Sequence, residues 1–495
     1  MKRIISLLLA LLMLAACFVG CASKDDDTES DKSVGTLGDD ESVPYDPAID
    51  GLYYDGMDIN IYYAEIGGMP RLEYEAIEYT GDAVSDVIFE RNLTVKEKFG
   101  VELSYNHKGG QEMVTDLKTL HSAGDPTVDI IAPYAYYGVA LAIEGVYADL
   151  NSLNYLNVNS SWWNQSYVDA ITYNDQLYSI IGDLTSSATS NAVATFVNMQ
   201  MMREFGLGDI DLFEVVESGK WTLDYMMLMC KDVYAEADGI NDRSEGDRFG
   251  FILGQISQPA EALLVSFGFD WTQKNDDGTM DFTLNSEKNI NILSSLESLY
   301  ASRFTGIYKV AAPAGSEFAT KGVGQYIELF TEKKTMVTIS FLMTAEELVK
   351  KPDIEYLILP VPKYNEDQTE YRTMTHDSHC NVSISSMSDS LDAAAAILEY
   401  MGYYSEKELT PQYFEISYKS KYASNENTMK LFDMIVDSIH FDFARTYSRS
   451  LDDVSQKMRG LVKDSLNISS TIATYQSKCQ RYLDQFIHRF KGLES

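Results

Sequence analysis

The segment that decides the fold is DINIYY at residues 58–63. Its β-branched and aromatic residues predict a β-strand. A helical pattern follows over 82–99, and a second strand is predicted over 100–105. A short helix over 113–121 and a third strand, VDIIA at 128–132, complete the series. This alternation of strands and helices predicts right-handed crossovers and a mainly parallel sheet, so the fold class is α/β.

The size and charge of the chain limit what it can be. It has 495 residues, which argues for more than one packing unit. With 39 Lys and Arg against 75 Asp and Glu, its formal net charge is −36. Nucleic-acid binding and docking on anionic lipid both need a basic surface, so the composition argues against either. The 33 tyrosines are compatible with a hydrogen-bonding recognition surface, but also with ordinary packing.

The N-terminus predicts export and a lipid anchor. Two basic residues precede an apolar run over 4–16, which is too short to span a bilayer comfortably and is typical of a signal peptide. Small residues before Cys17 and Cys21 resemble the lipobox of bacterial lipoproteins. We expect a signal peptide over 1–20 and lipidation of Cys21, with Cys17 as the alternative. Cleavage to a free secreted protein is the other alternative.

Residues 21–52 are predicted to be a disordered acidic tether, because Asp, Glu, Ser and Gly dominate and little can be buried. No later apolar stretch reaches spanning length, so the lipid is expected to be the only membrane attachment. The location predicted is the extracellular face of a cell membrane.

Sequence motifs for catalysis or metal binding are weak. Cys230, Cys380 and Cys479 form neither a disulfide framework nor a metal-ligand pattern. The loop over 238–247 is similar to a calcium loop but lacks the required order of ligands, so a polar turn is the better interpretation. His376 to Cys380 gathers reactive residue types, yet structural pairing explains them better than catalysis. No enzyme activity, cofactor or metal is expected.

Several segments along the chain carry a family resemblance through their order: 90–101, 125–131, 145–150, 162–165, 176–180, 247–251, 357–364 and 393–403. In this order they resemble segments of the extracellular solute-binding proteins of the maltose-binding-protein-like group. The resemblance covers nearly the whole chain after residue 57, and its strength lies in the order of the segments rather than in any one of them.

This resemblance implies a two-lobed, periplasmic-binding-protein-like fold of type II. Each lobe would hold a mainly parallel sheet flanked by helices, and hinge strands would join the lobes and allow closure. The first lobe would comprise 53–185 and 371–405, and the second 186–370 and 406–495. A C-terminal helix over 472–490, with one apolar face, would pack on a lobe.

The resemblance implies a carbohydrate ligand, which requires flat aromatic faces for a sugar ring and polar groups for its hydroxyls. In open α/β sheets, ligands bind beyond the carboxyl ends of the strands. Tyr136 and Tyr137 follow the third strand and either line the cleft or pack beneath their loop. One of the adjacent tryptophans is expected to pack in the core. The candidate ligand-binding residues are Thr127, Asp129, Tyr136, Tyr137, Trp162, Trp163, Trp271 and His376.

The function implied is that of a monomeric, lipid-anchored solute-binding protein of a Gram-positive-type bacterium. It would capture an oligosaccharide and deliver it to the permease subunits of an ABC importer. The alternatives are a surface glycan-capture or sensor protein without transport, a glycan hydrolase, and a protein that binds a non-sugar solute such as a peptide.

Overall fold

The computed structural model describes residues 45–65, 73–237, 239, 247–254, 258–275, 279–308, 324–351, 353–414, 426–463 and 468–492. The predicted signal peptide, both candidate lipidated cysteines and the tether up to residue 44 lie outside the described residues, as does most of the loop over 238–247. The described chain begins as packed structure, because Pro47–Gly51 form a short 3-10 helix (η1) and Ile49 is fully buried. The folded part therefore starts within the segment predicted to be tether.

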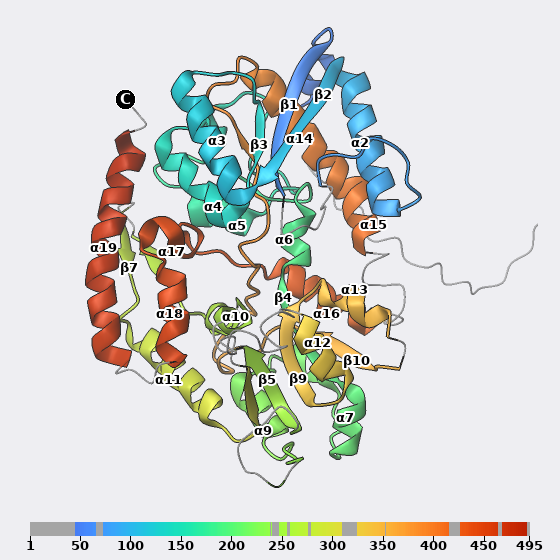
Figure 1. Cartoon of the computed structure of the whole chain (residues 1–495), viewed down its shortest axis with the longest axis vertical. Coiled ribbons are helices and arrows are strands. Elements are labelled where there is room, and N and C mark those ends of the chain that lie inside the picture. Colours follow the sequence, from blue (N-terminus) through green and yellow to red (C-terminus); the bar gives the residue numbers. More distant parts are fainter. Residues whose placement is uncertain are drawn as a thin grey trace, which may run out of the picture. The chain divides into compact units, whose positions relative to one another are not determined.

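The first sheet has the strand order β11-β3-β1-β2 (Figure 1). Strand β1 (Met57–Glu65) pairs in parallel with β2 (Val101–Gly109) and with β3 (Ile130–Ala132). The edge strand β11 (Ser383–Ile384) is antiparallel to β3 and comes from a distant part of the chain. The three strands predicted from the first part of the sequence are confirmed, and this sheet is mainly parallel.

Helix α2 (Ala83–Phe99) lies on this sheet with α3 (Gly110–Ala123) and α14 (Leu391–Tyr404). The Asp82 carboxylate caps α2 by accepting from the Ser85 backbone N–H, and Gly100 ends the helix at a φ of 61°. The elements between β3 and the second sheet are α4 (Ala135–Gly138), η2 (Val139–Glu144), η3 (Leu150–Ser152), α5 (Gln165–Ile171) and α6 (Ser186–Ser190), and α14 is followed by η5 (Ser405–Leu409) and α15 (Thr410–Phe414).

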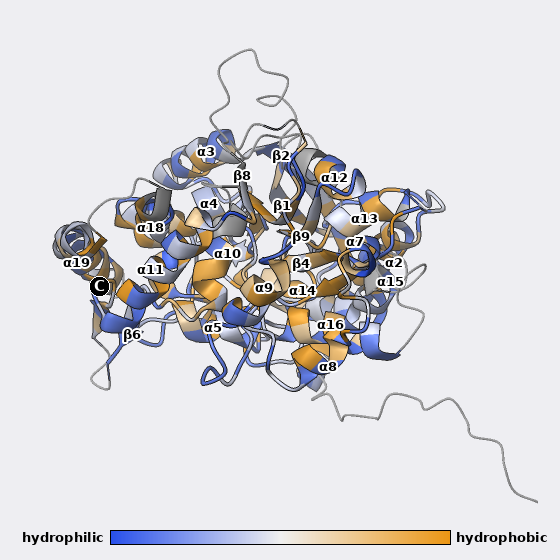
Figure 2. Ribbon diagram, turned by 90° about the horizontal axis from the view of Figure 1, so that it is seen from below, coloured by the Kyte–Doolittle hydropathy of each residue, from blue (hydrophilic) through white to orange (hydrophobic). Residues whose placement is uncertain are grey.

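The second sheet has the order β10-β4-β9-β5-β8, with bounds Tyr356–Leu359, Val193–Asn198, Thr335–Phe341, Phe249–Gly254 and Thr305–Tyr308. It is mixed rather than mainly parallel, because β4 is antiparallel to both of its neighbours. Every residue of β4 and β9 is buried, and Figure 2 colours these strands and α14 largely hydrophobic. Burial of every side chain along a strand is expected where both faces of the sheet are covered.

Helices cover the second sheet: α7 (Met199–Glu204), α8 (Leu212–Glu217), α9 (Leu223–Cys230), α10 (Gln258–Ser266), α11 (Glu287–Ala301), α12 (Gly324–Thr331), α13 (Thr344–Val349) and α16 (Glu426–Asp437). A separate pair of antiparallel strands is formed by β6 (Thr272–Lys274) and β7 (Met280–Phe282). None of the described helices is both long and apolar enough to span a bilayer.

The chain ends in α17 (Phe443–Thr446), η7 (Ser448–Leu451), α18 (Val454–Lys463) and α19 (Ile468–Gly492). The predicted C-terminal helix is thus present, and its buried face includes Ile472, Cys479, Phe486 and Phe490. Tyr482 lies outside this face, because it is 37% exposed and the neighbouring Leu483 is buried instead.

Residues 373–385, which we call the central crossing segment, connect the two sheets. Val193 N–H, at the start of β4, donates to the Met374 carbonyl, and His376 N–H donates to the Asn191 carbonyl. Farther along, Val382 exchanges two backbone hydrogen bonds with Ile180 before the segment enters the first sheet as β11. This single stretch is therefore hydrogen-bonded to chain that leads into both sheets.

A buried ion network supports the crossing. The Glu261 carboxylate of α10 is 2.7 Å from Arg445 Nε and 3.1 Å from Arg459 Nε. Arg445 also donates to the carbonyl of Thr375, in the central crossing segment. All three charged side chains are largely buried, so they depend on one another for the solvation that water would otherwise supply.

Replacing one member of this network should be costly. We expect Glu261→Gln to lower the free energy of unfolding by about 3–5 kcal/mol, because it leaves two buried guanidinium groups without a counter-charge. Glu355→Gln is the control, since the Arg203–Glu355 pair is about half exposed and should cost under about 1 kcal/mol. Urea denaturation measures the free energy of unfolding of both variants. Equal losses in the two variants would contradict the role of Glu261 as the counter-charge of two buried arginines.

Candidate functional site

The end of β3 is hydrogen-bonded to the central crossing segment. After Ala132 the chain turns, and Ala135 N–H donates to the His379 carbonyl at 3.0 Å. Tyr136 N–H donates to the Asp377 carbonyl at 3.1 Å. The short helix α4 is thereby fixed beyond the carboxyl end of a parallel strand, which is where α/β sheets bind their ligands.

Three tyrosines gather at this position. The rings of Tyr134 and Tyr137 have centroids 5.3 Å apart, and those of Tyr136 and Tyr137 are 4.9 Å apart and nearly perpendicular. These distances and angles are typical of favourable aromatic pairs. All three side chains are half-buried, so they are held in place by packing while part of each remains accessible.

Arg449 of η7 lies over these rings. Its guanidinium carbon is 4.5 Å from the Tyr137 ring centroid and 5.2 Å from that of Tyr136. One terminal nitrogen donates to Gln111 Oε1 of α3 at 2.8 Å. Gln456 of α18 donates to the Tyr136 hydroxyl at 3.0 Å. We call Tyr134, Tyr136, Tyr137 and Arg449 the tyrosine–arginine cluster.

His376 and its neighbours border the cluster. The His376 ring packs edge-on against Phe341, at the end of β9, with centroids 5.2 Å apart. Its Nδ1 accepts from the Ser378 backbone N–H at 2.9 Å. Burial lowers the pKa of His379 to about 4, so this imidazole is neutral near pH 7. Among the described residues, no group of His, Cys, Asp and Glu side chains is arranged to hold a metal ion.

The tryptophan pair has a different environment. Trp162 and Trp163 are both almost fully buried. Trp163 Nε1 donates to the Glu399 carboxylate at 3.1 Å, and Ser160 donates to the other oxygen of that carboxylate. Burial raises the pKa of Glu399 to about 6. A Cβ on Gly402 would lie 2.5 Å from a Trp162 ring carbon, which shows how closely the backbone of α14 covers this ring.

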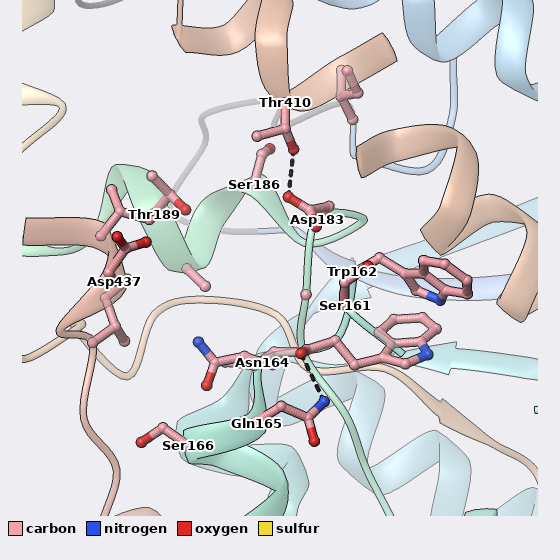
Figure 3. Close-up of a pocket in the computed structure, with 17 residues that line it drawn as sticks. Ser161, Trp162, Asn164, Gln165, Ser166, Asp183, Ser186, Thr189, Thr410 and Asp437 are labelled. Atoms are coloured by element: carbon pink, nitrogen blue, oxygen red, sulfur yellow. Dashed lines mark hydrogen bonds between the residues drawn. The ribbon is translucent and has the colours of Figure 1, made fainter. Parts of the chain in front are cut away.

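The two tryptophans contribute to the wall of a cavity of about 380 Å³, drawn in Figure 3. Asn164, Ser166, Thr189 and Asp437 also line it. Asp183 accepts a 2.6 Å hydrogen bond from Thr410, and burial raises the pKa of Asp183 to about 7. The tryptophan stretch thus lies beside Asp183 and Ser186, at the boundary predicted between the lobes, although Tyr136 and Tyr137 are not part of this lining.

Three predicted ligand-binding residues lie elsewhere. Thr127 is exposed before β3, and Asp129 is buried next to it. The Asp129 carboxylate accepts from Asn60 N–H at 2.9 Å and from the Ser388 hydroxyl at 2.5 Å, so it holds backbone at the amino end of the strand. Trp271 is 1% exposed and packs on Phe269 in the core. None of the three joins the tyrosine–arginine cluster.

The sequence analysis did not find Arg449, Gln111 or Gln456. The first belongs to a short 3-10 helix and the other two to helices far from residues 134–137 in the sequence. No local pattern indicates that these residues meet, because their proximity depends on how the C-terminal elements pack against α4.

Comparison with known proteins supports the fold. No protein-family model and no curated protein matches the chain. Solved structures do match. A cyclo/maltodextrin-binding protein complexed with maltotetraose matches with a TM-score of 0.57 and 12% identity, over 86% of this chain and 96% of that one.

Two other structures match in the same way. The cyclic α-maltosyl-1,6-maltose-binding protein of Arthrobacter globiformis gives a TM-score of 0.55 at 13% identity, over 87% of this chain and all of that one. An ABC substrate-binding protein of Listeria monocytogenes, in complex with cycloalternan, gives 0.53 at 13% identity over the same shares. The fold is that of a type II periplasmic binding protein. The fold class expected from the sequence is confirmed.

The burial of His379 predicts that the stability of the protein depends on pH. Unfolded His379 has an ordinary pKa of 6.5, against about 4 in the folded chain. Between these values the unfolded state binds the extra proton, so this residue lowers stability as the pH falls through that window. In His379→Gln, we expect the loss of unfolding free energy from pH 7.5 to 4.5 to be smaller by about 2–3 kcal/mol.

Urea denaturation at several pH values measures this effect. His440, whose pKa burial also lowers to about 4, stays in the variant and keeps part of the slope. The variant must show the wild-type circular dichroism spectrum at pH 7.5. If both proteins lose the same stability over the range, the buried, neutral state of His379 is wrong.

Proposed function

We propose that this protein is the lipid-anchored solute-binding component of an ABC importer, which captures an oligosaccharide between two lobes and presents it to a permease. The observation that carries the proposal is the tyrosine–arginine cluster beyond the carboxyl end of β3, fixed to the segment that crosses between the sheets. The lobe boundaries, the lipidated Cys21 and the extracellular location belong to the same proposal.

The chemistry of the cluster suits a sugar. Accessible tyrosine rings offer flat apolar faces for the C–H side of a pyranose, and burial of that face is favourable. Arg449, Gln111 and Gln456 are exposed and present planar polar groups that can pair with hydroxyls. A site that supplies both leaves few hydroxyl groups unpaired when water is displaced.

The comparisons point in the same direction. Each of the three matched structures is described as a sugar-binding or substrate-binding protein, and each contains or is named for an oligosaccharide. Binding of a ligand between lobes that close around it requires no covalent chemistry. The N-terminal lipobox-like sequence supports attachment at the membrane where an importer would receive the ligand.

A glycan panel tests the proposal. At a ligand concentration of 100 times Kd, a bound glycan adds about 2.7 kcal/mol to the stability of the native state, which raises Tm. We expect one or more oligosaccharides to raise Tm and to be recovered intact. Release of shorter sugars would show a hydrolase, and a Tm unchanged across the panel would contradict carbohydrate binding.

Variants locate the site. Tyr137→Ala should weaken binding of the active glycan roughly tenfold or more, because it removes a stacking face. Tyr137→Phe keeps that face and should bind nearly as the wild type does. Tyr79→Ala, at a residue that is 60% exposed and outside the cluster, is the matched control. Normal glycan binding by a folded Tyr137→Ala protein would rule out this location.

A further inference from the structure

Arg449 is the charged member of the tyrosine–arginine cluster. The guanidinium is exposed, rests on two tyrosine rings and donates to one neutral acceptor, Gln111 Oε1. Within the described parts of the chain, no carboxylate lies within ion-pair distance of it.

Five other arginines of the described chain are paired with carboxylates at 2.6–3.1 Å. These pairs are Arg203 with Glu355, Arg248 with Glu204, Arg372 with Asp270, and both Arg445 and Arg459 with Glu261. Among the described residues, Arg91, Arg303, Arg481 and Arg489 have no such ion pair, so the lack of a carboxylate partner does not by itself mark a site. What distinguishes Arg449 is its place over two tyrosine rings, at the site where a ligand is proposed to bind.

The surroundings of Arg449 favour the binding of a planar anion such as a carboxylate. Contact with the Tyr136 and Tyr137 rings restricts the guanidinium, so less side-chain entropy is lost when a ligand pairs with it. Gln111 accepts from one of its five N–H groups, and no other described protein group accepts from the rest. A carboxylate matches the paired N–H groups of a guanidinium and forms two parallel hydrogen bonds with it.

Two carboxylates limit how much negative charge the site tolerates. Asp453 Oδ1 is 3.5 Å from the Tyr136 hydroxyl, and Asp377 also acts electrostatically on Tyr136, so that together with burial they raise its pKa. A highly charged ligand would be repelled by these groups. One anionic group on Arg449, with neutral hydroxyls of the ligand near Asp453, fits this distribution of charge.

We infer that the ligand is an acidic oligosaccharide, with the carboxylate of a uronic acid residue paired to Arg449 and neutral hydroxyls around it. This inference rests on the proposed function and makes Arg449 the residue that selects acidic over neutral glycans. Loss of the charge should affect the acidic ligand far more than its neutral counterpart, because the tyrosine faces remain.

The test is isothermal titration calorimetry on the full-length chain in detergent, with matched pairs of sugars. The probes are a galacturonate trimer, a mannuronate trimer and a glucuronic acid-substituted xylotriose, each beside its carboxyl-reduced counterpart. We expect the acidic member of at least one pair to bind roughly tenfold or more tightly than its counterpart, and to weaken as salt is added.

Arginine variants complete the test. In Arg449→Gln the preference for the acidic sugar should fall below about twofold. Arg449→Lys should keep part of this preference, because lysine retains the positive charge but lacks the paired N–H groups of a guanidinium. Arg481→Gln, at an exposed arginine of α19, is the control and should behave as the wild type.

The outcomes separate the two claims. If a neutral sugar binds as tightly as its acidic partner and Arg449→Gln leaves that ratio unchanged, the inference is overturned while carbohydrate binding stands. If neither these sugars nor the wider glycan panel bind the wild-type protein, the proposed function fails and the inference fails with it.

Discussion

The backbone hydrogen bonds of the central crossing segment, 373–385, hold the architecture together. One end of the segment pairs with chain entering β4, and the other end becomes the edge strand of the first sheet. The same segment accepts from Ala135 and Tyr136 and so positions the tyrosine–arginine cluster. The location of the site is thus a consequence of how the chain passes between its sheets.

The stability of the region around the central crossing segment depends on buried polar groups, each of which needs a hydrogen-bond or ion-pair partner. Glu261 is neutralised by two arginines, and Glu399 accepts from Trp163 and Ser160. Burial raises the pKa of Asp183 and lowers that of His379, so both groups favour their neutral forms. Removing one partner from such a network lowers the free energy of unfolding. The networks therefore favour a single conformation of the central crossing segment over alternative conformations.

Much of the fold follows from local sequence, whereas the site follows only in part. Segments 58–63 and 82–99 have clear strand and helix patterns, and the structure contains both. The position of Tyr136 and Tyr137 after β3 was predictable from the rule for strand ends. The burial of Trp271 and the approach of Arg449 were not, because both depend on contacts between segments far apart in the sequence.

We propose that a sugar binds at the accessible tyrosine faces beside Arg449. A crystal structure of the protein with the glycan that binds most tightly tests it most directly. The claim predicts a sugar ring within ~4 Å of the Tyr136 or Tyr137 ring, in contact with Arg449. A sugar found instead in the cavity beside Trp162 and Asp183, with the tyrosine–arginine cluster empty, would contradict it.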